Sequence, residues 1–74
     1  MEFDKKRFGA MLREARIERG QSQKMMAADM GVSYTYISHL EAGRRTPTVE
    51  MFVRLCAQSE MDPTDILGAC CAPC

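Results

Sequence analysis

The side chains best suited to chemistry lie in two parts of this 74-residue chain. A segment in the middle places short hydrogen-bonding groups at helical spacing, at Tyr34, Thr35, Ser38 and His39. Hydroxyl, phenol and imidazole groups of this reach can bind the donors and acceptors on base edges in a major groove. Three thiols stand at the C-terminal end, at Cys70, Cys71 and Cys74. The sequence shows no acid–base pair, nucleophile constellation or phosphate loop, so we expect no catalysis and no cofactor.

Length and charge restrict the function further. A chain of 74 residues forms one domain with a small core, which weighs against an enzyme or a small-molecule substrate. No apolar stretch approaches the roughly 20 residues of a membrane span, and the N-terminus is no signal peptide, so we expect a cytoplasmic protein. Residues 1–24 hold seven basic and four acidic side chains, whereas residues 47–74 hold one basic and four acidic. One end of the domain can therefore meet phosphate while the other faces away.

Capping residues and glycines divide the chain into five helices. The side-chain oxygens of five residues can accept a first-turn N–H, at Asp4, Ser22, Ser33, Thr48 and Asp62. Glycines that suit helix C-terminal ends follow the apolar segments, at positions 20, 31, 43 and 68. These signals predict helices over residues 5–19, 23–30, 34–42, 49–59 and 63–67. No strand pattern competes, so we expect an all-α fold.

The second and third predicted helices form a helix-turn-helix, because only residues 31–33 join them and Gly31 stands in the turn. At about 100° per residue, Tyr36, Ile37 and Leu40 point inward from the third helix. The opposite face is polar but has no Lys or Glu, which a merely solvated face would favour. We therefore interpret this face as a surface that contacts bases in DNA.

The segment from Gly20 to Pro47 resembles the phage-repressor family of helix-turn-helix proteins, which includes lambda repressor and Cro and is also called XRE. The matching residues are Ser22, Gln23, Ala27, Gly31, Val32, Ser33, Ile37, Leu40, Glu41, Gly43 and Pro47, and the likeness covers about residues 5–67. The resemblance implies a five-helix, lambda-repressor-like DNA-binding domain, which we assign to residues 1–68. It also implies a sequence-specific transcriptional regulator of repressor or controller type, which binds a near-palindromic operator in double-stranded DNA as a homodimer.

The resemblance also implies the roles of single residues. The third helix holds the base-contact positions, and Gln23 binds phosphate at the positive end of the second helix. Arg44 and Arg45, in the following loop, contact backbone phosphates, although a basic pair in a loop is often only solvated. The expected DNA contacts are Gln23, Ser33, Tyr34, Thr35, Ser38, His39, Arg44 and Arg45. Arg16 and Glu41 match positions that form a buried, structural ion pair in related repressors.

Three residues depart from the family pattern. Gln21 and Ser59 stand where Leu is usual, and Met25 replaces the acidic residue that would complete a capping box with Ser22. These changes make the core smaller. They weaken the analogy with the family more for the dimer surface than for the DNA contacts. For that surface we expect exposed parts of the last two helices, which hold more apolar residues than one small core needs: Val49, Met51, Met61 and Ile66.

Residues 69–74 form a cysteine-containing tail unlike the family, and we expect it to be disordered. Cys71 and Cys74 have the spacing of a metal half-site, but a closed zinc site needs four ligands and Cys56 is predicted to face the core. We therefore favour a tail without metal over one that senses metal or thiol oxidation. The alternative function is a protein-interaction module or antitoxin-like protein, which the neutral net charge favours slightly.

Overall fold

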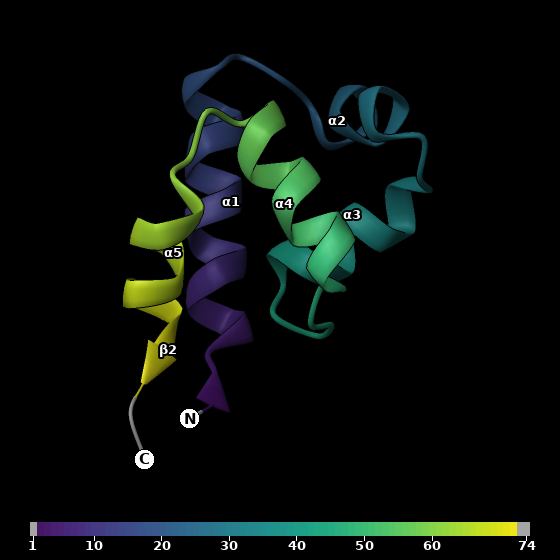
Figure 1. The fold of residues 1–74 in the computed structure, drawn as a ribbon. Helices are drawn as coiled ribbons and strands as arrows, with labels where there is room; N and C mark the ends of the chain where they lie inside the picture. Colours follow the sequence, from purple (N-terminus) through teal and green to yellow (C-terminus); the bar gives the residue numbers. More distant parts are fainter. Residues whose placement is uncertain (1, 73–74) are drawn as a thin grey trace.

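Five helices follow one another along the chain in a computed structural model that describes residues 2–72 (Figure 1). They are α1 (Lys5–Glu18), α2 (Gln23–Met30), α3 (Tyr34–Glu41), α4 (Val49–Gln58) and α5 (Pro63–Cys70). Two strands of two residues, β1 (Glu2–Phe3) and β2 (Cys71–Ala72), pair beside the start of α1. The all-α prediction is confirmed, since this short ribbon adds no second layer. Within the described part, no helix combines the length and the apolar character needed to cross a bilayer.

Each helix begins where its capping residue predicts. All five predicted caps accept a backbone N–H with a side-chain oxygen, as Ser22 does from Met25 and Ser33 from Tyr36, both over 3.1 Å. The turn between α2 and α3 needs a left-handed residue at its first position, and Gly31 supplies it with φ of 69°. These contacts join residues only a few positions apart, so the sequence is enough to place them.

The core lies between α1 and the other four helices. α1 packs against α3 on one side and α5 on the other, and α2 packs against α3. Phe8 of α1 and Phe52 of α4 stack with their ring centroids 5.5 Å apart, and Phe3 of β1 meets both rings. α1 and α3 cross at Gly9, where a Cβ atom would overlap the carbonyl oxygen of Leu40. The crossing that supports the helix-turn-helix therefore depends on a residue without a side chain.

The C-terminal end differs from the sequence-based expectation. α5 continues through Gly68 to Cys70, and residues 71–72 pair with β1 in antiparallel register, with Phe3 opposite Cys71. The Cys70 side chain is fully buried and its Sγ lies 3.7 Å from Sδ of Met11. Residues 69–72 are thus ordered rather than a disordered tail, because burial of Cys70 extends the helix beyond the glycine that locally suits a helix end. The rest of the expected tail, residues 73–74, lies outside the described residues.

Candidate nucleic-acid interface

The outer face of α3 presents the polar residues that the sequence predicts for DNA contact. Tyr34 is 48% exposed and Thr35 is exposed, while Ser38 and His39 are half-buried. Ile37 and Leu40 are fully buried on the opposite face. Tyr36, predicted to point inward, is only half-buried and packs against the edge of the core. Ser33 caps the helix and is exposed, so it stands beside this face.

Two cations lie over aromatic rings in the first turn of α3. Nζ of Lys24, in the first turn of α2, lies 5.9 Å from the centre of the Tyr34 ring. The guanidinium carbon of Arg45, beyond the C-terminal end of α3, lies 5.2 Å from the centre of the Tyr36 ring. Both distances fall within the range of cation–π attraction. Positive charge therefore lies beside the first turn of α3, and sequence reasoning identified Arg45 but missed Lys24.

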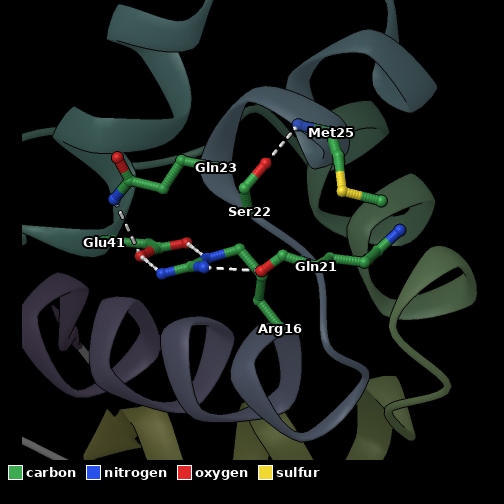
Figure 2. A network of polar contacts seen from close by, with 6 residues as sticks. All are labelled: Arg16, Gln21, Ser22, Gln23, Met25 and Glu41. Atoms are coloured by element: carbon green, nitrogen blue, oxygen red, sulfur yellow. Dashed lines mark hydrogen bonds and ion pairs between the residues drawn. The ribbon is translucent and has the colours of Figure 1, made fainter.

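Arg16 and Glu41 form a two-bonded ion pair between α1 and α3 (Figure 2). Nε of Arg16 donates to Oε2 of Glu41 over 2.7 Å, and Nη2 donates to Oε1 over 3.0 Å. The third donor, Nη1, reaches the backbone oxygen of Gln21 over 2.8 Å. The two side chains are only 11% and 3% exposed. The hydrogen bond to Glu41 raises the pKa of Arg16 against the opposing effect of burial, so the pair stays charged.

Gln23 has a different environment from the one expected. Its Nε2 donates to Oε1 of Glu41 over 3.0 Å, so the side-chain amide is held by the ion pair (Figure 2). First-turn N–H groups have no acceptor within their own helix, and Ser22 takes only that of Met25. The start of α2 can therefore offer phosphate the backbone N–H groups of Gln23 and Lys24 without releasing the Gln23 side chain.

A polar hollow of about 300 Å³ lies where α1, α2 and α3 meet. It is lined by Arg13, Gln23, Ser38, Glu41 and Ala42. Arg13 is exposed, and sequence reasoning missed it, although its position three residues before Arg16 places it near the same face of α1. Arg44 and Arg45 are exposed in the loop that follows α3, and their expected contact with phosphate stays a prediction.

The apolar surface differs in part from the expected dimer residues. Val49 is 82% exposed as predicted, but Met51 and Met61 are half-buried against the core and Ile66 is only 3% exposed. Ile66 was therefore wrongly assigned to an exposed surface, because α5 turns this residue toward the core. A groove of about 370 Å³ instead lies between β1, α4 and α5, and its exposed apolar members include Val49, Val53 and Leu67.

Three of the four cysteines, Cys56, Cys70 and Cys71, lie in the described part of the chain. Among residues 2–72, no group of three or more His, Cys, Asp or Glu side chains is placed to hold a metal ion. Cys56 and Cys70 are fully buried, and burial raises the pKa of both thiols. Because the thiolate is the form that binds metal, burial disfavours metal binding by these two residues. Cys71 is half-buried, and Cys74 lies outside the described residues.

Known proteins resemble this chain in sequence and in structure. Residues 12–58 match the family HTH_3, described as helix-turn-helix. The chain is 34% identical over 60 residues to the ImmF control region 10 kDa protein of Bacillus phage phi105, which covers 81% of this chain and 67% of that protein. Its fold is similar to the restriction-modification controller protein C.AhdI from Aeromonas hydrophila, with a TM-score of 0.76, 28% identity, and coverage of 85% of this chain and 91% of that one.

The clp gene regulator ClgR from Corynebacterium glutamicum is also similar, with a TM-score of 0.79 and 29% identity over 89% of this chain and 70% of that one. Proteins of this family are transcriptional regulators, a class that is generally not enzymatic. The sequence match spans all of α2 and α3 and therefore includes the polar face described above. This chain is a DNA-binding transcriptional regulator and belongs to the helix-turn-helix family HTH_3.

Proposed function

We propose that this regulator represses or controls transcription by occupying a near-palindromic operator as a homodimer, with α3 of each protomer in the major groove. The observation that supports this most is the polar outer face of α3, which has Lys24 and Arg45 beside its first turn and no unpaired carboxylate. Glu41, the one acidic residue of α3, is neutralised by Arg16. A duplex phosphate can therefore approach this face without meeting an uncompensated negative charge. Such an operator would be occupied in the cytoplasm.

In this proposal each part of the interface has its own task. Thr35, Ser38 and His39 contact base edges, and Tyr34 contacts either a thymine methyl or a phosphate. The backbone N–H groups at the start of α2 bind one phosphate, with Arg13 beside them at the polar hollow. Arg44 and Arg45 bind phosphates on the other side of α3.

A dimer is favoured by the size of α3. Its eight residues span about 12 Å, so one protomer contacts only a short stretch of groove. Two recognition helices about 34 Å apart would meet two half-sites on one face of the duplex. We assign the contact between protomers to the groove at Val49, Val53 and Leu67, because these exposed apolar side chains lie together and none of the described residues that line the groove is charged.

The DNA proposal is tested by selecting bound duplexes from random DNA and measuring affinity for the preferred sequence. The combined change Thr35→Ala, Ser38→Ala and His39→Ala should lower that affinity by about 100-fold or more, since each good base contact is worth about 1–3 kcal/mol. The matched control changes Thr64→Ala and Asp65→Asn on α5 and should leave affinity unchanged. If the triple variant keeps the preference of the parent protein, α3 does not read the operator.

Salt dependence separates the binding of phosphates from the reading of bases. Removing Arg44 and Arg45 together should reduce the slope of log affinity against log salt by about 0.9 for each phosphate that these side chains neutralise. The decrease in affinity should be similar on preferred and random duplexes. An unchanged slope would show that Arg44 and Arg45 are solvated and do not contact phosphate. A nearly flat slope for the parent protein would favour a protein partner, instead of DNA, on the polar face of α3.

The dimer surface has a test with a well-matched control. Val53→Glu places a charge in the apolar groove and should shift the protein to monomer in sedimentation equilibrium. Ile17→Glu changes a side chain of almost equal exposure on α1, 54% against 51%, and should leave the dimer intact. The assignment would be contradicted if the concentrated parent protein is monomeric both with and without DNA. It would also be contradicted if the Val53→Glu variant remains a dimer.

A further inference from the structure

A second groove, of about 270 Å³, lies between α1 and α5. Its apolar lining comes from half-buried Met11, Ala15 and Met61 and from buried Ile66. Its acidic lining comes from four carboxylates, which belong to Glu14, Glu18, Asp62 and Asp65. None of the lining residues that the structure describes is basic. The surface therefore combines an apolar strip with a border of negatively charged side chains.

The groove faces away from the proposed DNA-binding surface. α1 packs against α3 on one side and α5 on the other, so α5 and its groove lie on the side of α1 opposite α2 and α3 (Figure 1). At about 100° per residue, Glu14 and Glu18 lie on a different face of α1 from Arg13 and Arg16. When α3 meets a duplex, this groove stays open to solvent, and its carboxylates would repel a second nucleic acid.

The four carboxylates that line the groove carry like charges and repel one another. Glu14 and Glu18 are four residues apart on α1, so like charges adjoin on that helix. Asp62 caps α5 and Asp65 stands in its first turn, where the helix N-terminus favours acidic groups. The pair of Glu14 and Glu18 therefore destabilises α1 slightly. The nearest ion pair joins Arg19 to Glu60 over 3.2 Å and leaves all four groove carboxylates out. A cationic partner would turn this repulsion into attraction.

We propose that the α1–α5 groove binds a basic amphipathic segment of a protein partner. An aliphatic side chain of that segment packs against Met11 and Met61, and flanking Lys or Arg side chains pair with the carboxylates on both helices. The inference is independent of the dimer contact, because Pro63 and Leu67 line the other groove from a different face of α5. A DNA-bound dimer would thus present one such site on each protomer.

The test uses the full-length protein with methyl-labelled methionine and needs no DNA. The probe is a short synthetic peptide with Leu flanked by Lys, and its counterpart carries Glu in place of Lys. The Lys peptide should shift the methyl signals of Met11 and Met61 saturably and leave that of Met25, which is 53% exposed on α2, unchanged. The Glu peptide should shift none of them. This experiment can fail while the operator proposal stands, and the reverse also holds.

Charge variants complete the test. Glu14→Gln with Glu18→Gln should raise the dissociation constant of the Lys peptide by about threefold or more, because each exposed ion pair contributes only modestly. The control, Glu50→Gln with Glu60→Gln, removes the same charge outside the groove and should have little effect. Equal weakening by both variants, or no shift at Met11 and Met61, would overturn the proposal. If the methyl signals of Met11 and Met61 shift with protein concentration alone, a second copy of the chain occupies the groove. That result would also overturn the proposal.

Discussion

Breaking the ion pair between Arg16 and Glu41 should remove much of the stability of this domain. A chain of 74 residues has a free energy of unfolding of about 4–11 kcal/mol. Glu41→Leu leaves the Arg16 guanidinium, 11% exposed, without its carboxylate, and Arg16→Met leaves a carboxylate that is 3% exposed with only the Gln23 amide as a donor. Loss of one partner from a buried pair costs about 3–5 kcal/mol, so either single variant removes much of the stability.

The double variant Arg16→Met with Glu41→Leu should be no less stable than either single one, because it removes both charges together. The main remaining cost is the Gln21 carbonyl, which loses the hydrogen bond from Nη1 of Arg16. We therefore expect a coupling energy of about 3 kcal/mol between the two positions. Urea unfolding followed by far-ultraviolet circular dichroism measures it, since the chain is largely helical and contains no Trp.

The pair of Arg19 and Glu60 is the matched control. Its atoms lie 3.2 Å apart, but the side chains are 35% and 80% exposed. The same cycle of four proteins, with Arg19→Met and Glu60→Leu, should give a coupling below about 1 kcal/mol. If the single variants at Arg16 and Glu41 each cost less than about 1 kcal/mol and the two cycles agree, burial does not strengthen the inner pair and the reasoning is refuted.

Alkylation of the cysteines and three single substitutions should also have clear outcomes. At about pH 8, an alkylating reagent should modify Cys71 well before Cys70 in the folded protein. The reason is that burial raises the pKa of Cys70, so little of its reactive thiolate forms. Peptide mapping would show the order of modification, and equal rates would contradict the prediction. Gly9→Ala should lower the free energy of unfolding by about 1–3 kcal/mol through the clash with α3, whereas Gly68→Ala, which meets nothing within 4 Å, should raise it by about 0.5–1 kcal/mol. Ser59→Ala should stabilise the protein by about 1 kcal/mol in urea unfolding, since the Ser59 hydroxyl is buried without a partner among the described residues; a loss of stability would show that the hydroxyl is satisfied.

The departures from the family pattern have visible consequences in the core. The buried side-chain oxygens without a partner in the described part of the chain are Oε1 of Gln21 and Oγ of Ser59, the two positions where Leu is usual. Gln21 and Gln58 both donate to Oδ2 of Asp29, over 3.0 and 3.2 Å. The sequence identified these substitutions, but only the packed structure shows that Asp29 satisfies the two amide nitrogens and that two oxygens stay unmatched.

The proposed interface was only partly predictable. The polar face of α3 follows from helical periodicity, because each residue advances about 100° and the inward side must be apolar. Lys24 and Arg13 were missed, since their proximity to α3 depends on how three helices meet. The attachment of Gln23 to Glu41 could not be inferred from spacing alone, because those residues stand 18 positions apart in the chain.

The sequence alone determined where the helices begin, which face of each is apolar and which family the chain resembles. A cap, a turn and a helical stripe each depend on residues within one or two turns of each other, so short-range chemistry is sufficient. The tertiary structure alone decided that Cys70 belongs to the core, that Ile66 is buried and that residues 2–3 and 71–72 pair as strands. Those outcomes require contacts between distant segments, and their free energy exists only once the whole domain has packed.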